Sequence, residues 1–216
     1  MSCGCDSNVP FDGVSQEYKK VLWIVIAINI VMFGVEMSAS LISNSVALRA
    51  DSLDFLGDSL TYCISLIAIG HSLKWRASAA LFKGFTLLAL GLWVLASTVY
   101  QTFILGVPNE FIMGTVAFTA FAANIISALL LYKFREGDAN VRSVWLCSRN
   151  DAINNIAVMI AAAVVYLTQS QWPDLIVAFI MATLFLRSSY LIFRQALGEL
   201  EVDLGQRVRT SLRIPK

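Results

Sequence analysis

Long apolar blocks, separated by short polar connections, dominate the hydrophobic pattern of this chain. The blocks are about 18 or more residues long, the length that an α-helix needs to cross the hydrocarbon core of a bilayer. They do not show the apolar–polar alternation of a half-buried strand. The pattern predicts an all-α integral membrane protein whose six transmembrane helices span residues 21–42, 48–70, 79–104, 111–132, 143–168 and 174–197.

The polar segments at the two ends set the expected domain organisation. The first twenty residues lack the apolar core of a secretory signal peptide, so residues 1–20 are expected to form a cytoplasmic leader. A six-helix transport domain over residues 21–197 follows. Residues 198–216 are expected to form a short cytoplasmic tail, too short to fold as a domain.

Lysine and arginine residues predict the orientation of the chain in the membrane, because cytoplasmic loops carry an excess of them. One side carries Lys19, Lys20, Lys74, Arg76, Lys133, Arg135, Arg142, Arg207, Arg209, Arg213 and Lys216. The other side carries only Arg49, at the start of the second block. Both termini are therefore expected in the cytoplasm, with the protein in the cell membrane (the inner membrane in a Gram-negative source).

Composition agrees with a membrane protein and excludes some partners. Hydrophobic residues make up 57% of the chain and charged residues 14%, with a mean hydropathy of +0.70. A soluble domain has about 25% charged residues. The net charge of +1 comes without a basic tract, so no nucleic-acid partner is expected. Cys63 and Cys147 lie inside apolar blocks, so a disulfide framework is not expected.

Ionisable residues inside a bilayer are costly and usually functional. The apolar blocks contain Glu36, Asp51, Asp54, Asp58, Arg149, Asp151 and Arg187. In the second block the three aspartates fall on one helix face, with Asp54 and Asp58 one turn apart. Two such carboxylates must share protons, bind a cation or contact water. A water-exposed helix start or a cap near the outer surface accounts for Asp51 but not for Asp58.

The fifth block carries a matching pair. Cys147, Asp151 and Asn154 fall on one face, whereas Arg149 points to the opposite face, where an ion pair or a water contact is expected. Counting from the inner helix ends, the two pairs lie at similar depths near the middle of the membrane. Asp54 is expected opposite Asp151, and Asp58 opposite Cys147.

Asp54, Asp58, Cys147 and Asp151 together offer three oxygens and one sulfur to a cation. Zinc accepts carboxylate and thiolate in a tetrahedral site. Magnesium and calcium prefer six or more oxygens, and a thiolate favours softer ions such as cadmium. The prediction is a transported divalent metal, zinc first and cadmium next, without a prosthetic group.

The remaining candidates have weaker patterns. Cys3 and Cys5 form a C-x-C pair in the leader, which is either a disordered segment or a metal-delivery site. Cys63 is expected to be a small apolar filler. His71 is expected at the cytoplasmic interface, and Arg187 is expected to reach the interface or pair with a carboxylate.

Two motifs resemble those of the cation diffusion facilitator family. SNSVALRADSLDFLGDSLTY resembles the second-helix signature, in which Asp54 and Asp58 occupy the metal-ligand positions. VRSVWLCSRNDAINN resembles the fifth-helix signature, with Cys147 in place of the usual histidine and with Asp151. Asn29 and Asn124 also match positions where the family often carries asparagine. The resemblance covers about residues 20–197, and the chain is expected to be a short form without the family's C-terminal cytoplasmic domain.

The resemblance implies a homodimer that exports metal from the cytoplasm in exchange for protons. We therefore expect a metal/proton antiporter that works by alternating access on zinc, and also on cadmium and cobalt. One alternative is a membrane protein that binds or senses metal without transporting it. Another is an organic-cation transporter, in which Cys147 has no role. An intramembrane aspartyl protease is not expected because its Gly-x-Gly-Asp signature is absent, so the protein is not expected to be an enzyme.

Overall fold

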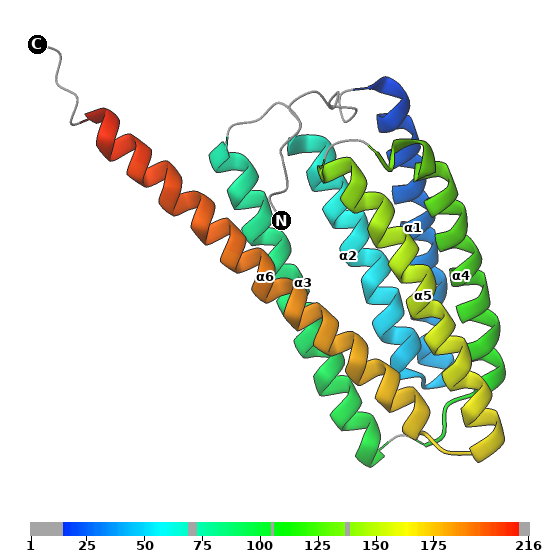
Figure 1. Ribbon diagram of the computed structural model, residues 1–216. Helices are drawn as coiled ribbons and strands as arrows, with labels where there is room; N and C mark the ends of the chain where they lie inside the picture. Colours follow the sequence, from blue (N-terminus) through cyan, green and yellow to red (C-terminus); the bar gives the residue numbers. More distant parts are fainter. Residues whose placement is uncertain (1–14, 69–72, 105, 137–138, 212–216) are drawn as a thin grey trace, which may run out of the picture.

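The computed structural model describes residues 15–68, 73–104, 106–136 and 139–211, and these residues form helices without a strand (Figure 1). The elements are α1 (Gln16–Ser43), α2 (Val46–Ala68), α3 (Leu73–Ile104), α4 (Glu110–Leu131), the short 3-10 helix η2 (Tyr132–Phe134), α5 (Ala139–Thr168) and α6 (Trp172–Ser211). The all-helical prediction is confirmed for this part of the chain.

The helices form two groups that meet along α2 and α5. Helices α1, α2, α4 and α5 lie side by side, and the α3–α6 pair diverges from them toward the end where α2 stops and α5 begins (Figure 1). Helix α2 packs against α1, α3, α5 and α6. The element with the highest density of acidic side chains is therefore in contact with both groups.

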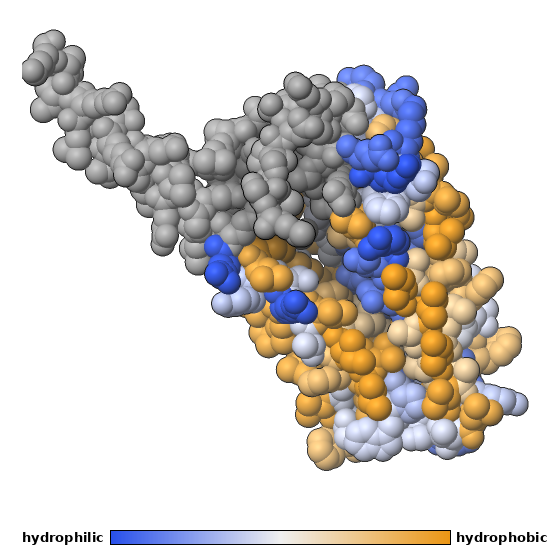
Figure 2. Space-filling view, in the orientation of Figure 1, coloured by the Kyte–Doolittle hydropathy of each residue, from blue (hydrophilic) through white to orange (hydrophobic). Residues whose placement is uncertain are grey.

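The described helices place apolar side chains on the outside, as expected for a protein surrounded by lipid. Phe103, Phe111 and Leu167 are 81%, 79% and 78% exposed. Figure 2 shows apolar residues over much of the visible lower face. Buried positions include Glu36 and Asp51. Since a soluble protein rarely exposes so much contiguous apolar surface, this is a multi-pass membrane protein.

Five described helices are long and apolar enough to cross a membrane. The exception is α2, because Arg49, Asp51, Asp54 and Asp58 lower its hydropathy. A sixth span through α2 and the cytoplasmic position of both termini stay predictions.

Several helices extend beyond their predicted bounds. Helix α1 begins at Gln16 rather than residue 21, because Ser15 caps it by accepting a hydrogen bond from the Tyr18 amide at 3.1 Å. Helix α6 continues to Ser211, past the predicted end at residue 197. After Pro173, in the first turn of α6, the next proline is Pro215, so the polar segment can remain helical outside an apolar block.

The start of α2 is fixed by Asp174 in the first turn of α6. Its carboxylate accepts hydrogen bonds from the backbone amides of Val46 at 2.8 Å and Ala47 at 3.1 Å. The Ser45 hydroxyl donates to it at 2.6 Å, and the Gln101 side-chain amide of α3 at 3.3 Å. A carboxylate at a helix N-terminus satisfies free N–H groups and interacts favourably with the helix dipole. Asp174 therefore ties α2 to α3 and α6.

The sequence-based prediction for Asp51 was wrong. It placed Asp51 at a water-exposed helix start, whereas the side chain is 1% exposed and lies inside α2. Asp174, from a helix distant in sequence, takes the capping role instead.

Candidate metal-transport site

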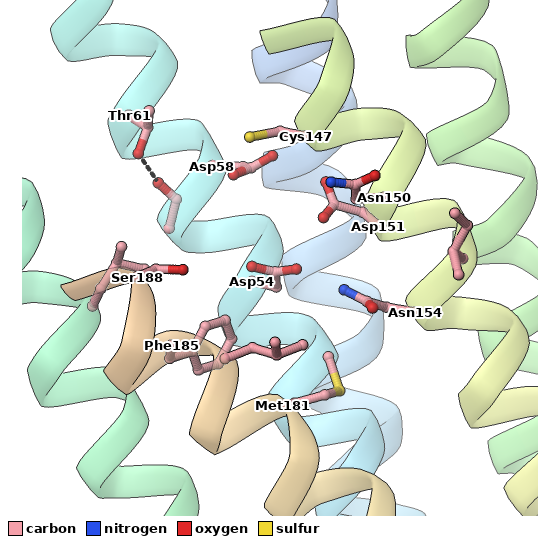
Figure 3. Close-up of a pocket in the computed structure, with 14 residues that line it drawn as sticks. Asp54, Asp58, Thr61, Cys147, Asn150, Asp151, Asn154, Met181, Phe185 and Ser188 are labelled. Atoms are coloured by element: carbon pink, nitrogen blue, oxygen red, sulfur yellow. Dashed lines mark hydrogen bonds between the residues drawn. The ribbon is translucent and has the colours of Figure 1, made fainter. Parts of the chain in front are cut away.

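A cavity of about 420 Å³ lies between α2 and α5 on one side and α6 on the other. All four predicted ligands, Asp54, Asp58, Cys147 and Asp151, line it (Figure 3). The i, i+4 spacing on each helix aims each pair into the same space because four residues make about one helical turn. The structure thus brings the predicted residues together, and their role as ligands remains a prediction.

The two pairs meet across the α2–α5 interface with Asp58 at the centre. The carboxyl groups of Asp58 and Asp151 lie within hydrogen-bonding reach of each other. Figure 3 shows the Cys147 sulfur and the Asp58 carboxyl pointing toward one another. The predicted register placed Asp151 opposite Asp54, whereas the closer partner of Asp151 is Asp58. Asp58 therefore faces both α5 residues.

Tyr62 contacts Asp58 from one turn further along α2. Its hydroxyl donates a hydrogen bond to the Asp58 carboxylate, and the tyrosine side chain is completely buried. Such a contact fixes the orientation of a ligand and the position of its charge. Sequence analysis missed this residue, although its place one turn after Asp58 on the same helix is a usable signal.

The other side of the cavity is mainly apolar. Met181, Leu184 and Phe185 come from α6, and Leu87 comes from α3. Asn154, predicted on the face of Cys147 and Asp151, also lines the cavity. An apolar wall opposite a group of carboxylates keeps the local dielectric low, which strengthens their attraction for a cation.

The side chains line a cavity rather than a closed coordination sphere. Within the residues that the structure describes, no three Cys, His, Asp or Glu side chains are arranged to hold one metal ion. To bind one ion together, the four side chains would have to move closer to one another. Three carboxylates and one thiolate form a donor set that zinc and cadmium accept.

A second group of buried polar residues lies one turn from the cavity. The Asn155 amide of α5 donates to the Asp51 carboxylate at 2.7 Å, and Asn124 of α4 donates to the Asn155 oxygen at 3.4 Å. Glu36 of α1 faces Asp51 and is 0% exposed. Sequence analysis named Glu36 as intramembrane but assigned it no partner, because contacts between helices require a known register.

The remaining sequence candidates lie away from the cavity. The Arg149 guanidinium lies 5.3 Å from the centre of the Trp145 ring, donates to the Asn150 side-chain oxygen at 3.1 Å and is exposed, as expected for the opposite face. Cys63 is a free thiol that packs in an apolar cluster, in agreement with a filler role. Arg187 is exposed. Cys3, Cys5 and His71 lie outside the described residues.

The chain is similar to known transport proteins over most of its length. The sequence model of the cation efflux transmembrane domain matches residues 22–200. A zinc transporter, ZitB, from Yersinia pestis is 29% identical over 210 residues, which cover 87% of this chain and 66% of the relative. A cadmium, cobalt and zinc/H(+)-K(+) antiporter from Bacillus velezensis is 24% identical over 83% of this chain and 62% of the relative. The chain thus spans slightly less than two thirds of these relatives.

Proposed function

This chain belongs to the cation efflux family, and from that premise we propose that it exports a divalent transition-metal cation across the cell membrane. Zinc is the first candidate cargo, with cadmium next and cobalt also accepted. Relatives named as zinc transporters and as a cadmium, cobalt and zinc antiporter support this range of metals. No prosthetic group and no enzymatic activity are part of the proposal.

The observation that carries the proposal is the convergence of Asp54, Asp58, Cys147 and Asp151 on one cavity between α2, α5 and α6. We expect these four residues to bind the cargo. Several carboxylates in an apolar setting cannot all remain charged without a cation. A divalent ion lowers that cost by offsetting two of the negative charges, so the cavity favours a metal over a neutral solute.

The same charge argument supports exchange of metal for protons. When metal leaves, protons must replace part of its charge on the carboxylates, and when metal binds, those protons must leave. A carrier that opens the cavity alternately to the two sides then couples metal movement to proton movement in the opposite direction. The α3–α6 pair diverges from the other four helices (Figure 1), and we expect these two groups to move relative to each other when the cavity changes its opening.

The assembly and the topology complete the proposal. We expect six spans, with α2 shielded from lipid by its four neighbouring helices, and both termini in the cytoplasm. We also expect a homodimer in the membrane, as the family resemblance implies.

Metal uptake by vesicles containing the purified protein tests the proposal. Zinc, cadmium, cobalt, manganese and magnesium are offered to wild type and to Asp54→Ala, Asp58→Ala and Asp151→Ala. Glu17→Gln is the matched control, because this acidic residue is exposed and forms an ion pair with Lys133 at the surface. We expect each aspartate variant to fold but to lose zinc uptake, and the control to retain it. Normal uptake by any two aspartate variants would place the site elsewhere.

A further inference from the structure

Glu36 has a local environment that the proposed metal site does not explain. Its side chain is 0% exposed, and neither carboxyl oxygen receives a hydrogen bond from a donor group in the described part of the chain. The group within hydrogen-bonding reach is the Asp51 carboxyl of α2, which is itself 1% exposed. Two acceptors face each other, and a proton between them would give both a partner.

Among the residues that the structure describes, none that faces this pair carries a positive charge that could replace the proton. The charged groups that face Glu36 are Asp51 and Asp54, both on α2. Helix α5 contributes the Asn155 amide to Asp51, and α4 contributes Asn124 behind it. Asp174 of α6 binds the start of α2 and interacts with Arg49 there. Amide groups orient a carboxylate but do not neutralise it, so both acids cannot be charged at once without a cation.

Asp51, one member of the pair, also borders three residues that line the metal cavity. A small void is lined by Asp51 together with Asp54, Asp58 and Asp151, and Asn124 closes its side. Asp51 precedes Asp54 by about one turn of α2, and Asn155 follows Asp151 by one turn of α5. The contact between Asp51 and Asn155 therefore lies about two turns closer to the start of α2, and one turn further along α5, than the contact between Asp58 and Asp151.

We propose that Glu36 and Asp51 form a dedicated proton-binding site, separate from the metal ligands, that carries one of the exchanged protons. The inference rests on the proposed function. Without metal, the two carboxyl groups share one proton. When a divalent ion enters one turn away, its charge favours the ionised form. The shared O–H bond then breaks, the proton passes through the void to water in the cavity, and both carboxylates remain charged until the metal leaves.

The coupling ratio measures this proton directly. The membrane potential of the vesicles is clamped at zero. Metal then accumulates until its luminal-to-external concentration ratio equals the corresponding proton ratio raised to the power n, where n is the number of protons exchanged for each metal ion. Removing one exchanged proton lowers the final zinc ratio by about tenfold at a gradient of about one pH unit. We expect this drop for Glu36→Gln, with zinc binding itself retained. Glu136→Gln, an exposed acid 82% accessible at the surface, is the matched control and keeps the wild-type ratio.

Infrared difference spectroscopy supplies a second readout on the unmodified protein. With the glutamate carboxyl carbons labelled with ¹³C, the band of a protonated glutamic acid is present without zinc and disappears on zinc addition. This experiment decides the question if Glu36→Gln does not fold. In the folded variant the same band is missing.

The outcomes separate the two proposals. Wild-type vesicles that do not move zinc would refute the proposed function. If the wild-type protein couples zinc to protons but Glu36→Gln reaches the same final zinc ratio, the proton site alone is overturned. The proton site is also overturned if the wild-type protein shows no protonated glutamate band that responds to zinc. Transport that follows a sodium or potassium gradient instead of pH would also overturn it, because the pair would then hold a metal cation.

Discussion

Replacing Asp174 by alanine should destabilise the protein strongly, because its carboxylate accepts four hydrogen bonds at a buried helix start. The donors are the Ser45 hydroxyl, the Val46 and Ala47 amides and the Gln101 side chain, at 2.6 to 3.3 Å. Hydrogen bonds to charged groups contribute about 1.5–3 kcal/mol each, or about 6–12 kcal/mol for four of them. Desolvation of the carboxylate offsets part of that sum. We expect a net loss of about 3–5 kcal/mol, the range for breaking a buried charge interaction.

Equilibrium unfolding in mixed micelles, followed by far-ultraviolet circular dichroism, measures this loss. Asn109→Ala is the matched control, because Asn109 also caps a helix but accepts a single exposed hydrogen bond from Ile112 at 3.0 Å. The control should lose only about 1 kcal/mol. Asp174→Asn should fall between the two, since its amide keeps one acceptor oxygen. An Asp174→Ala variant no less stable than Asn109→Ala would refute the assignment of Asp174 as the group that fixes α2.

Two further predictions concern the cavity. Tyr62→Phe removes the hydroxyl that donates to Asp58 and should weaken zinc binding by about 10-fold or more, as measured by competition with a fluorescent chelator; unchanged affinity would mean that the tyrosine only packs. Cys147→His should shift the binding preference from cadmium toward zinc, and Cys147→Ser should lower cadmium affinity more than zinc affinity, because imidazole and hydroxyl are harder ligands than thiolate; equal losses for both metals would show that Cys147 is not a ligand.

The helices and the residues of the cavity could be predicted from sequence because both follow from local spacing. An apolar block that is long enough to cross a membrane as a helix predicts a transmembrane helix. Two residues spaced i, i+4 lie on the same face of a helix, whatever that face packs against. Helix ends were less accurate: Ser15 extends α1, and α6 continues as a polar helix to Ser211. These ends depend on caps and on the absence of a breaker rather than on hydropathy.

The interhelical contacts could not be predicted because they depend on the rotation and register of packed helices. Asp51 has the local appearance of a cap, yet Asp174, more than a hundred residues later, performs that role. Similarly, nothing in the spacing of α1 indicates that Glu36 faces Asp51 rather than lipid. Both contacts involve buried polar groups, for which a sequence specifies the need for a partner but not which residue supplies it.

Zinc accumulation against a pH gradient tests the central claim most directly. Vesicles containing the wild-type protein are prepared with a lumen more acidic than the bath, and luminal zinc is followed with a trapped indicator. The account predicts accumulation above the bath concentration, reversal when the gradient is inverted, and no accumulation after a protonophore is added. Zinc that equilibrates across the membrane regardless of the pH gradient, or that does not enter at all, would contradict it.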